Sequence, residues 1–173
     1  MKKNATYHYY VEGEDEKSIL DALKSELKCI ESGKVEKFNV VQNKITAARI
    51  RPLKYGVVVV LVYDTDVETN TEILKYNIDF LRRQSGIREV ICIPQVKNLE
   101  DELKRSCKIK CIGALTNSKT TTDYKRALIS CTNLGARLKK CNFNISKFWK
   151  QLPTNSFQQF GNDAEKIKIY DKK

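Results

Sequence analysis

The chain has 173 residues, of which 41% are hydrophobic, and carries a formal net charge of +11 from 32 Lys+Arg against 21 Asp+Glu. This length suits one domain with a buried core, and the composition excludes a chain disordered over most of its length. The excess positive charge favours an anionic partner, most commonly nucleic acid, although a basic protein that is merely soluble is the alternative.

The sequence predicts a cytoplasmic protein with no membrane partner. No apolar run approaches the roughly 20 residues that a membrane span needs, and the first ten residues lack the apolar core of a signal peptide. The six cysteines are scattered through regular segments. This spacing indicates reduced thiols in a reducing compartment and not a disulfide framework.

Up to residue 95 the predicted elements alternate between strands and helices. One helix is expected on the stripe formed by Ile19, Leu23, Leu27 and Ile30, and another over residues 68–84. Residues 43–54 are compatible with a short helix. Strands are expected over residues 6–11, 37–42, 57–63 and 88–93, with Pro94 closing the last one.

The fold class follows from the third predicted strand. Its seven consecutive apolar or aromatic residues, 57–63, suit a strand that is buried on both faces, and such strands are typical of parallel sheets. We therefore expect an α/β fold of three layers, in which a mostly parallel four-stranded sheet over residues 1–95 has helices on both faces.

Residues 96–173 form a predicted basic helical extension that packs on this core, so that the whole chain is one compact unit. Helical spacing indicates helices near residues 99–103, 124–138 and 145–152. Phe148 and Trp149 are expected to dock the last helix onto the core, and the tail beyond Pro153 has few apolar residues, so its end is expected to fray.

Acidic residues follow the predicted strands at the points where they end. Glu12 ends the first strand, with Glu16 one helical turn later, and Asp64 and Asp66 end the third. Glu100 follows the fourth strand. Because ligands of open parallel sheets bind beyond the carboxyl ends of the strands, we expect these carboxylates to converge.

A bound cation stabilises a cluster of carboxylates, because neighbouring negative charges repel one another and raise the pKa of each carboxyl group. Mg²⁺ or Mn²⁺, as one or two ions, prefers such oxygen ligands. For residues 12–16 alone, capping of a helix N-terminus explains the acids equally well. The two acids at the end of an apolar central strand, Asp64 and Asp66, shift the interpretation toward a metal site.

The stretches "YYVEGEDE" (residues 9–16) and "VVVVLVYDTD" (residues 57–66) together resemble the signature of the TOPRIM domain, in which one hydrophobic strand ends in E-G-x-x-E and another in D-x-D. The resemblance covers residues 6–94. It implies that Glu12 and Glu16 are catalytic acids and that Gly13 makes a tight turn. In the branch similar to the OLD (overcoming lysogenization defect) nucleases, a further acid helps to hold a second metal ion. The implied metal ligands are Glu12, Glu16, Asp64, Asp66 and Glu100.

The resemblance implies metal-dependent hydrolysis of DNA or RNA phosphodiester bonds, possible roles in defence against phage or mobile DNA, and a partner protein such as an ATPase. The chain lacks the additional regions of topoisomerases and primases. Lys119 and Lys97 are candidate catalytic lysines, and an ordinary surface lysine is the alternative for each. The residues expected to contact nucleic acid are Lys97, Lys104, Arg105, Lys125 and Arg126.

Two other functions remain open on the sequence. The acids could be structural in a non-catalytic nucleic-acid-binding module. Alternatively, the protein could be a small metal-dependent nucleotide phosphohydrolase whose basic surface is incidental. The sequence gives no indication of the oligomeric state.

Overall fold

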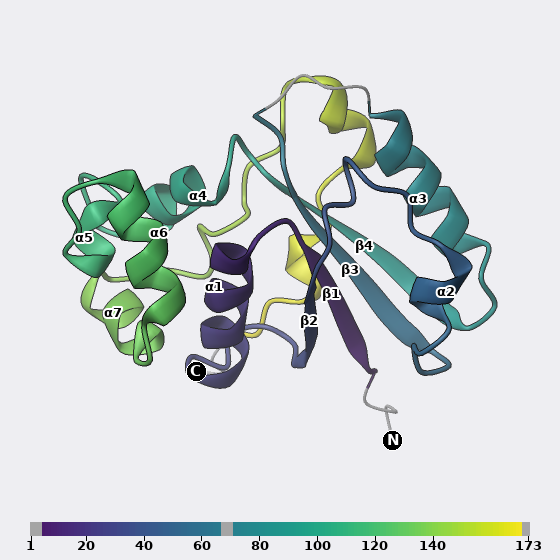
Figure 1. Ribbon diagram of the computed structural model, residues 1–173, viewed down its shortest axis with the longest axis horizontal. Coiled ribbons are helices and arrows are strands. Elements are labelled where there is room, and N and C mark those ends of the chain that lie inside the picture. The colour runs from purple at the N-terminus through teal and green to yellow at the C-terminus, as the bar shows by residue number, and fades with distance from the viewer. Residues whose placement is uncertain (1–4, 67–70, 171–173) are drawn as a thin grey trace.

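The computed structural model describes residues 5–66 and 71–170 of the chain. Four parallel strands form one sheet in the order β2-β1-β3-β4 (Figure 1). They are β1 (Tyr7–Val11), β2 (Gly33–Lys37), β3 (Val57–Asp64) and β4 (Ile87–Gln95). The predicted α/β class and the parallel four-stranded sheet are confirmed.

Helices cover both faces of the sheet, as predicted. One face packs against α1 and the helices of the C-terminal part, and the other packs against α3 (Figure 1). The helices are α1 (Glu14–Ser25), α2 (Ala47–Ile50), α3 (Glu72–Arg82), α4 (Leu99–Ser106), α5 (Gly113–Thr116), α6 (Thr121–Ser130) and α7 (Leu134–Lys140), followed by the short 3₁₀ turns η1 (Ser156–Phe160) and η2 (Ala164–Lys166).

Strand β3 shows why the core has two parts. Successive side chains of a strand point to opposite faces. Val58, Val60 and Val62 belong to the cluster on the α1 face, whereas Val59 and Leu61 belong to the cluster on the α3 face. Every residue from Val57 to Tyr63 is buried, which accounts for the uninterrupted apolar run.

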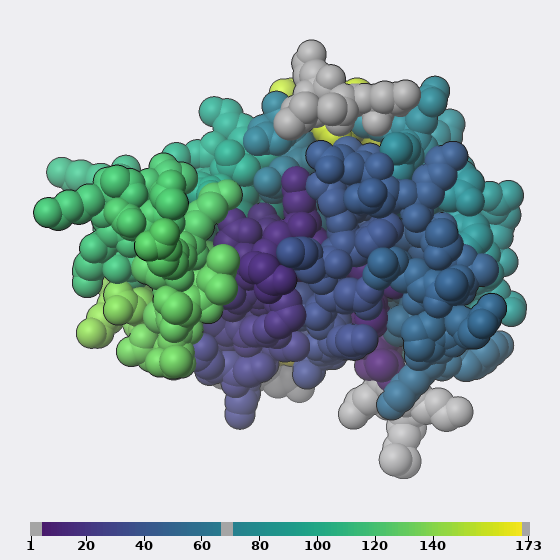
Figure 2. Space-filling view, viewed as in Figure 1, coloured from purple at the N-terminus to yellow at the C-terminus, as the bar shows by residue number. Residues whose placement is uncertain are grey.

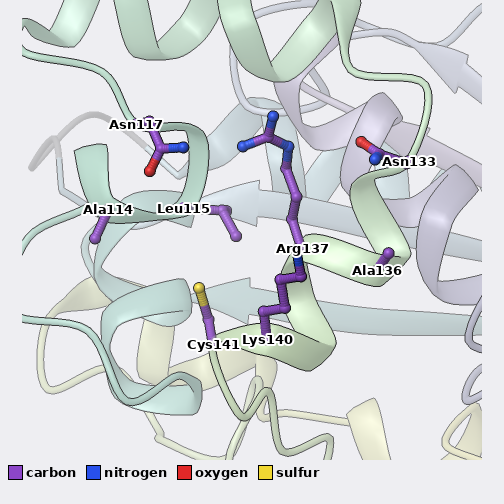
Figure 3. A pocket seen from close by; sticks show the side chains of 8 residues that line it. All are labelled: Ala114, Leu115, Asn117, Asn133, Ala136, Arg137, Lys140 and Cys141. Carbon is purple, nitrogen blue, oxygen red and sulfur yellow. The ribbon is translucent and has the colours of Figure 1, made fainter.

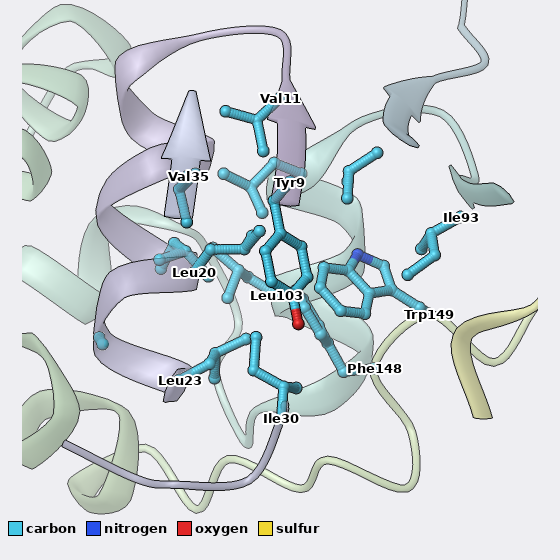
Figure 4. Close-up of a cluster of buried hydrophobic side chains, with 14 of the residues drawn as sticks. Tyr9, Val11, Leu20, Leu23, Ile30, Val35, Ile93, Leu103, Phe148 and Trp149 are labelled. Atoms are coloured by element: carbon cyan, nitrogen blue, oxygen red, sulfur yellow. The ribbon is translucent and has the colours of Figure 1, made fainter. Parts of the chain in front are cut away.

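The core on the α1 face joins the sheet to the C-terminal part of the chain. Figure 4 shows Tyr9 from β1 close to Leu20 of α1, Leu103 of α4 and Trp149. Phe148 and Trp149 are buried, so the expected docking of these aromatic residues on the core is confirmed. The expected helix around them is wrong, because residues 145–149 form turns.

The second strand lies earlier in the chain than predicted. The expected strand at 37–42 is wrong, since β2 spans Gly33–Lys37, and Phe38 and Val40 instead pack in the core on the α3 face. The hydrophobic pattern of β2 in the sequence is weak, because only Val35 of its five residues is buried. Gly33 is required there, since a Cβ would collide with the backbone carbonyl of Tyr7 on the neighbouring strand.

Three other boundaries differ from expectation. Pro94 does not close the fourth strand, which continues to Gln95, because a proline is tolerated on an edge strand such as β4. The helix expected at 68–84 is α3, and its expected start lies outside the described residues. The helix expected over 124–138 is broken at residues 131–133 into α6 and α7.

The C-terminal segment returns to the sheet. The backbone N–H of Asp163 donates to the carbonyl of Cys92 in β4 at 2.8 Å, and the side chain of Asn155 donates to the carbonyl of Thr65 at 2.8 Å. Phe157 and Ile167 are buried. The expected fraying at the end of the tail falls on residues 171–173, outside the described part, but residues 153–170 are packed. Within the described ranges, no helix is long and apolar enough to cross a membrane.

Candidate active site

The strand order places a crevice between β1 and β3. From β1 the chain passes to β2 on one side and then crosses to β3 on the other side of β1, so the winding direction reverses between β1 and β3. In open parallel sheets, ligands bind beyond the carboxyl ends of the strands at this switch point. Acidic residues gather here, and we call them the acidic edge: Glu12, Asp15, Glu16, Asp64, Asp66 and Glu100.

Asp64 is the acid at the end of the central strand. Burial raises its pKa to about 8, and the charges of Glu12, Asp66 and Glu100 add to this increase, whereas a hydrogen bond from Gln95 opposes it. The Gln95 Nε2 group donates to Asp64 Oδ1 at 2.6 Å, and the Trp149 indole N–H donates to Gln95 Oε1 at 3.3 Å. This chain of contacts fixes the orientation of the Asp64 carboxyl group.

Glu12 lies directly across the switch point from Asp64. Burial raises the pKa of Glu12, and the charges of Asp66 and Asp15 contribute, whereas hydrogen bonds involving the Asp64 backbone and the Asn39 side chain act in the opposite direction. A small hollow of about 40 Å³ opens between these groups. Its lining residues are Glu12, Asn39, Val41, Gln42, Asp64, Asp66 and Phe157.

Asp15 and Glu16, in the first turn of α1, fold back over Gly13. A Cβ at position 13 would lie 2.7 Å from Asp15 Oδ1 and 2.8 Å from Glu16 Oε2, so a larger residue there would require these two carboxyl groups to shift. Glu16 is only 4% exposed, and its Oε2 accepts no hydrogen bond from any described residue. Burial raises the pKa of Glu16 to about 9, with contributions from Asp15 and Asp64.

One cation from the helical part of the chain reaches the acidic edge. The Lys125 ammonium group on α6 lies 3.6 Å from Asp15 Oδ2 and 3.6 Å from Glu100 Oε1. Burial acts to lower the pKa of Lys125, but the charges of Asp15, Glu100 and Glu16 outweigh it and raise the pKa. Lys125 therefore offsets part of the negative charge of Asp15 and Glu100 and remains a cation at the acidic edge.

The structure brings together the predicted ligands but not as a closed coordination shell. Among the described residues, no three acidic, histidine or cysteine side chains have the arrangement of a complete metal site. The chemistry of the donors nevertheless fits Mg²⁺ or Mn²⁺, because the candidate ligands are all carboxylates, Glu16 Oε2 is buried without a partner among the described residues, and burial raises the pKa values of Asp64 and Glu16.

The basic residues predicted to contact nucleic acid differ in their exposure and in their ion pairs. Arg105 forms an ion pair with the buried Glu102 at 2.7 Å and donates a hydrogen bond to the Val96 carbonyl. Its guanidinium group is therefore occupied by contacts within the protein. Lys104 pairs with Asp101 at 2.6 Å. Lys97 and Arg126 are exposed. Lys119 is exposed in the turn before α6, and no described contact joins it to the acidic edge.

Sequence reasoning did not place Lys125 at the acidic edge, and it overlooked other residues of the site. Lys125 is predicted to contact nucleic acid, and its position beside Asp15 and Glu100 is set by the packing of α6 on α1. Gln95 could have been suspected, because a glutamine that continues an apolar strand must find a buried partner. Nothing in the local sequence indicates that Phe157, from the tail, lines the hollow.

The fold and the site define an α/β protein with a parallel sheet and a cluster of acids at its topological switch point. No protein-family model, curated protein or solved structure matches the chain. The acidic edge and its surroundings are therefore the features of this molecule that bear on its function.

Proposed function

We propose that this protein is a metal-dependent nuclease that hydrolyses phosphodiester bonds of DNA or RNA. The observation that carries the proposal is the convergence of carboxylates from β1, α1, β3 and α4 at the switch point of the sheet, with raised pKa values at Glu12, Glu16 and Asp64. Carboxylates that repel one another in a buried position are stabilised when a divalent cation binds. The resemblance to TOPRIM sequences points to the same chemistry.

Glu12, Asp64 and Asp66 would hold Mg²⁺ or Mn²⁺, with Glu16 and Glu100 available for a second ion. When bound, such an ion polarises the scissile phosphate and lowers the pKa of a water molecule. Gln95 keeps the Asp64 carboxyl oriented toward the hollow. Lys125 lies where its ammonium group can stabilise negative charge on the phosphate, a role for which the sequence offers Lys119 and Lys97 as candidates.

The size of the hollow supports a polymer substrate over a nucleotide held in a deep pocket. A volume of about 40 Å³ at the acids accommodates an ion and little else. A substrate must therefore lie over the acidic edge and not within it. We also propose that the protein acts in the cytoplasm, because its six cysteines are scattered through regular segments and do not form a dense disulfide framework in the sequence.

A non-catalytic nucleic-acid-binding module is the second candidate function. It is favoured by the absence of a closed ligand cluster among the residues that the structure describes, and by the ion pairs that Lys125 makes with Asp15 and Glu100. In that case the acids serve to hold α6 and not to bind a metal ion.

The first test compares cleavage of labelled single-stranded DNA, duplex DNA and RNA by the wild type and by Asp64→Asn, with Mg²⁺, with Mn²⁺ and with a chelator. We expect metal-dependent cleavage that falls at least about 100-fold in the variant, because a carboxylate ligand is replaced by a neutral amide. Asp79→Asn, on the exposed face of α3, is the matched control and should retain activity.

If the wild type binds these polymers without cutting them, and Asp64→Asn binds equally well with or without metal, the binding module is the correct function. Rapid hydrolysis of nucleotides without cleavage of polymers would instead identify a phosphohydrolase.

A further inference from the structure

A second polar site lies in the helical part of the chain, away from the acidic edge. A cavity of about 210 Å³ opens between α5 and α7, and Asn117, Asn133, Arg137 and Lys140 are among its lining residues. Figure 3 shows the Arg137 guanidinium group between the side chains of Asn117 and Asn133. A neighbouring cavity of about 290 Å³ shares Asn133 and Arg137 and adds Ser130 of α6. The guanidinium group therefore borders both cavities.

Arg137 has no counter-ion in the described part of the chain. Its Nε atom is buried without a hydrogen-bond partner, and no described acid forms an ion pair with it. Residues 107–140 contain eight Lys+Arg and only one acid, Asp123. The Asp123 carboxylate accepts a hydrogen bond from Thr120 Oγ1 at 2.7 Å, at the start of α6. An arginine that is always charged, has no ion-pair partner among the described residues and borders a cavity beside two asparagines is suited to bind an anion.

Helix α6 connects this cavity to the acidic edge. Lys125 contacts Asp15 and Glu100, and Ser130, five residues further along the same helix, borders the second cavity. Five helical residues correspond to a rise of about 7.5 Å. The axial rise between successive nucleotides of one duplex strand is roughly 3.4 Å, so this distance corresponds to about two nucleotides. Figure 2 shows the green surface of these helices directly beside the purple surface of α1.

We propose that the cavity around Arg137 binds a phosphate of a nucleic-acid backbone, and that it thereby holds the strand that crosses the acidic edge. The part that concerns the acidic edge rests on the proposed nuclease function. The guanidinium group can donate two parallel hydrogen bonds to phosphate oxygens, and the amides of Asn117 and Asn133 can donate others. Contacts of this kind fix the position of the strand without reading its sequence.

The test measures binding of fluorescently labelled single-stranded DNA and RNA by anisotropy, in a chelator so that no cleavage occurs, over a series of salt concentrations. Arg137→Gln should weaken binding about fivefold or more at low salt and reduce the slope of log K against log salt by about 0.7, the value of one phosphate contact on a single strand. Lys139→Gln, which removes the same charge from an exposed position of the same helix, should change the affinity less than about twofold.

Equal effects of Arg137→Gln and Lys139→Gln would overturn the proposal, because they would reflect net charge alone. It would also be overturned if the wild type did not bind nucleic acid. Arg137→Lys keeps the charge and should restore part of the affinity, and circular dichroism shows whether each variant is folded. A loss of binding in both Arg137 variants with unchanged folding would assign the contact to the planar guanidinium group.

A separate arm identifies the source of the phosphate. If inorganic phosphate raises the melting temperature of the wild type but not of Arg137→Gln, and nucleic-acid binding is unchanged in that variant, the cavity takes a free phosphate and the backbone assignment fails. Failure of the nuclease proposal gives a different result. If the wild type cuts no nucleic acid but Arg137→Gln weakens nucleic-acid binding, the phosphate site stands and the nuclease function fails. If the wild type cuts nucleic acid but Arg137→Gln and Lys139→Gln bind it as well as the wild type does, the cavity around Arg137 is not a phosphate site.

Discussion

At the scale of single residues, the acidic edge stores unfavourable electrostatic energy. Glu16 is nearly fully buried, and its pKa of about 9 lies far above the ordinary value of 4.5. The pKa of Asp64 is raised from 3.8 to about 8. The hydrogen bond from Gln95 lowers this cost at Asp64, whereas Glu16 Oε2 has no such partner in the described structure. The two carboxyl groups therefore differ in how readily each gives up its proton to a cation.

The first prediction concerns the pH dependence of stability. With folded pKa values of about 9 and about 8 against ordinary values of 4.5 and 3.8, Glu16 and Asp64 bind more protons in the folded state than in the unfolded state. Stability should therefore fall as pH rises between about 5 and about 9, by at most about 1.4 kcal/mol per pH unit for each group.

Urea unfolding in a chelator at several pH values measures this dependence. Mg²⁺ should flatten it, because metal binding favours the deprotonated carboxylates, and Glu16→Gln should remove the contribution of Glu16. Stability that rises with pH over the same interval would contradict the prediction.

At the scale of elements, α6 supplies the cation and α1 supplies two of the acids. The Lys125 side chain is about half exposed, so its ion pairs contribute little to stability, less than about 1 kcal/mol. In the proposed nuclease its effect on a bound phosphate would be larger, since it would act where the substrate excludes water. The Lys125 charge is therefore expected to matter more for the proposed activity than for stability.

We predict that Lys125→Met lowers the rate of phosphodiester cleavage by about tenfold or more while the midpoint of urea unfolding changes little. The neighbouring exposed residue provides a matched control, and Arg126→Met should reduce the rate much less. A large loss of stability in Lys125→Met, or equal losses of rate in both variants, would show that Lys125 does not act at the acidic edge.

A further prediction tests the close packing of β2 against β1. Gly33→Ala places a methyl group against the carbonyl of Tyr7, so the strands must separate, at a cost of about 1–3 kcal/mol of unfolding free energy. Gly86→Ala is the control, because its methyl group would meet only Tyr55 Cδ2, at an ordinary 3.8 Å. Urea unfolding of the two variants should give clearly different midpoints. Equal midpoints would mean that β2 shifts freely on the edge of the sheet.

The sequence predicted those parts of the fold that carry strong periodic patterns. The buried strand β3 and the acids at its end were predicted correctly, because an apolar run and a D-x-D stretch are local features. The edge strand β2 was misplaced because it buries only Val35. The neighbours of Asp64 depend on contacts between distant segments, such as Trp149 with Gln95, and no local pattern encodes them.

At the scale of the whole molecule, the C-terminal segment completes the structure around the acidic edge. Phe157 is 1% exposed, lies 5.8 Å from the ring of Tyr63, and lines the hollow with Glu12 and Asp64. The core that holds the acids therefore includes residues more than 90 positions away along the chain from Asp64. The sheet and the helical part share this core.

We predict that Phe157→Ala destabilises the protein by about 3–5 kcal/mol, because it opens a cavity beneath the end of β3. Phe160→Ala, at a partly buried position of the same turn, should cost less. Thermal unfolding compares the two, and nuclease assays below the melting temperature of Phe157→Ala should also show a loss of rate. If both variants are equally stable, the tail does not support the site.

The two edge strands of the sheet, β2 and β4, determine whether copies of this protein can associate by strand pairing at high concentration. On β2, Lys34, Glu36 and Lys37 place charges along the outer strand. On β4, Pro94 lacks an N–H group, and Asp163 pairs with both the N–H and the carbonyl of Cys92. An extended strand from another molecule thus finds few free backbone partners at either border, and the sheet resists growth into fibrils.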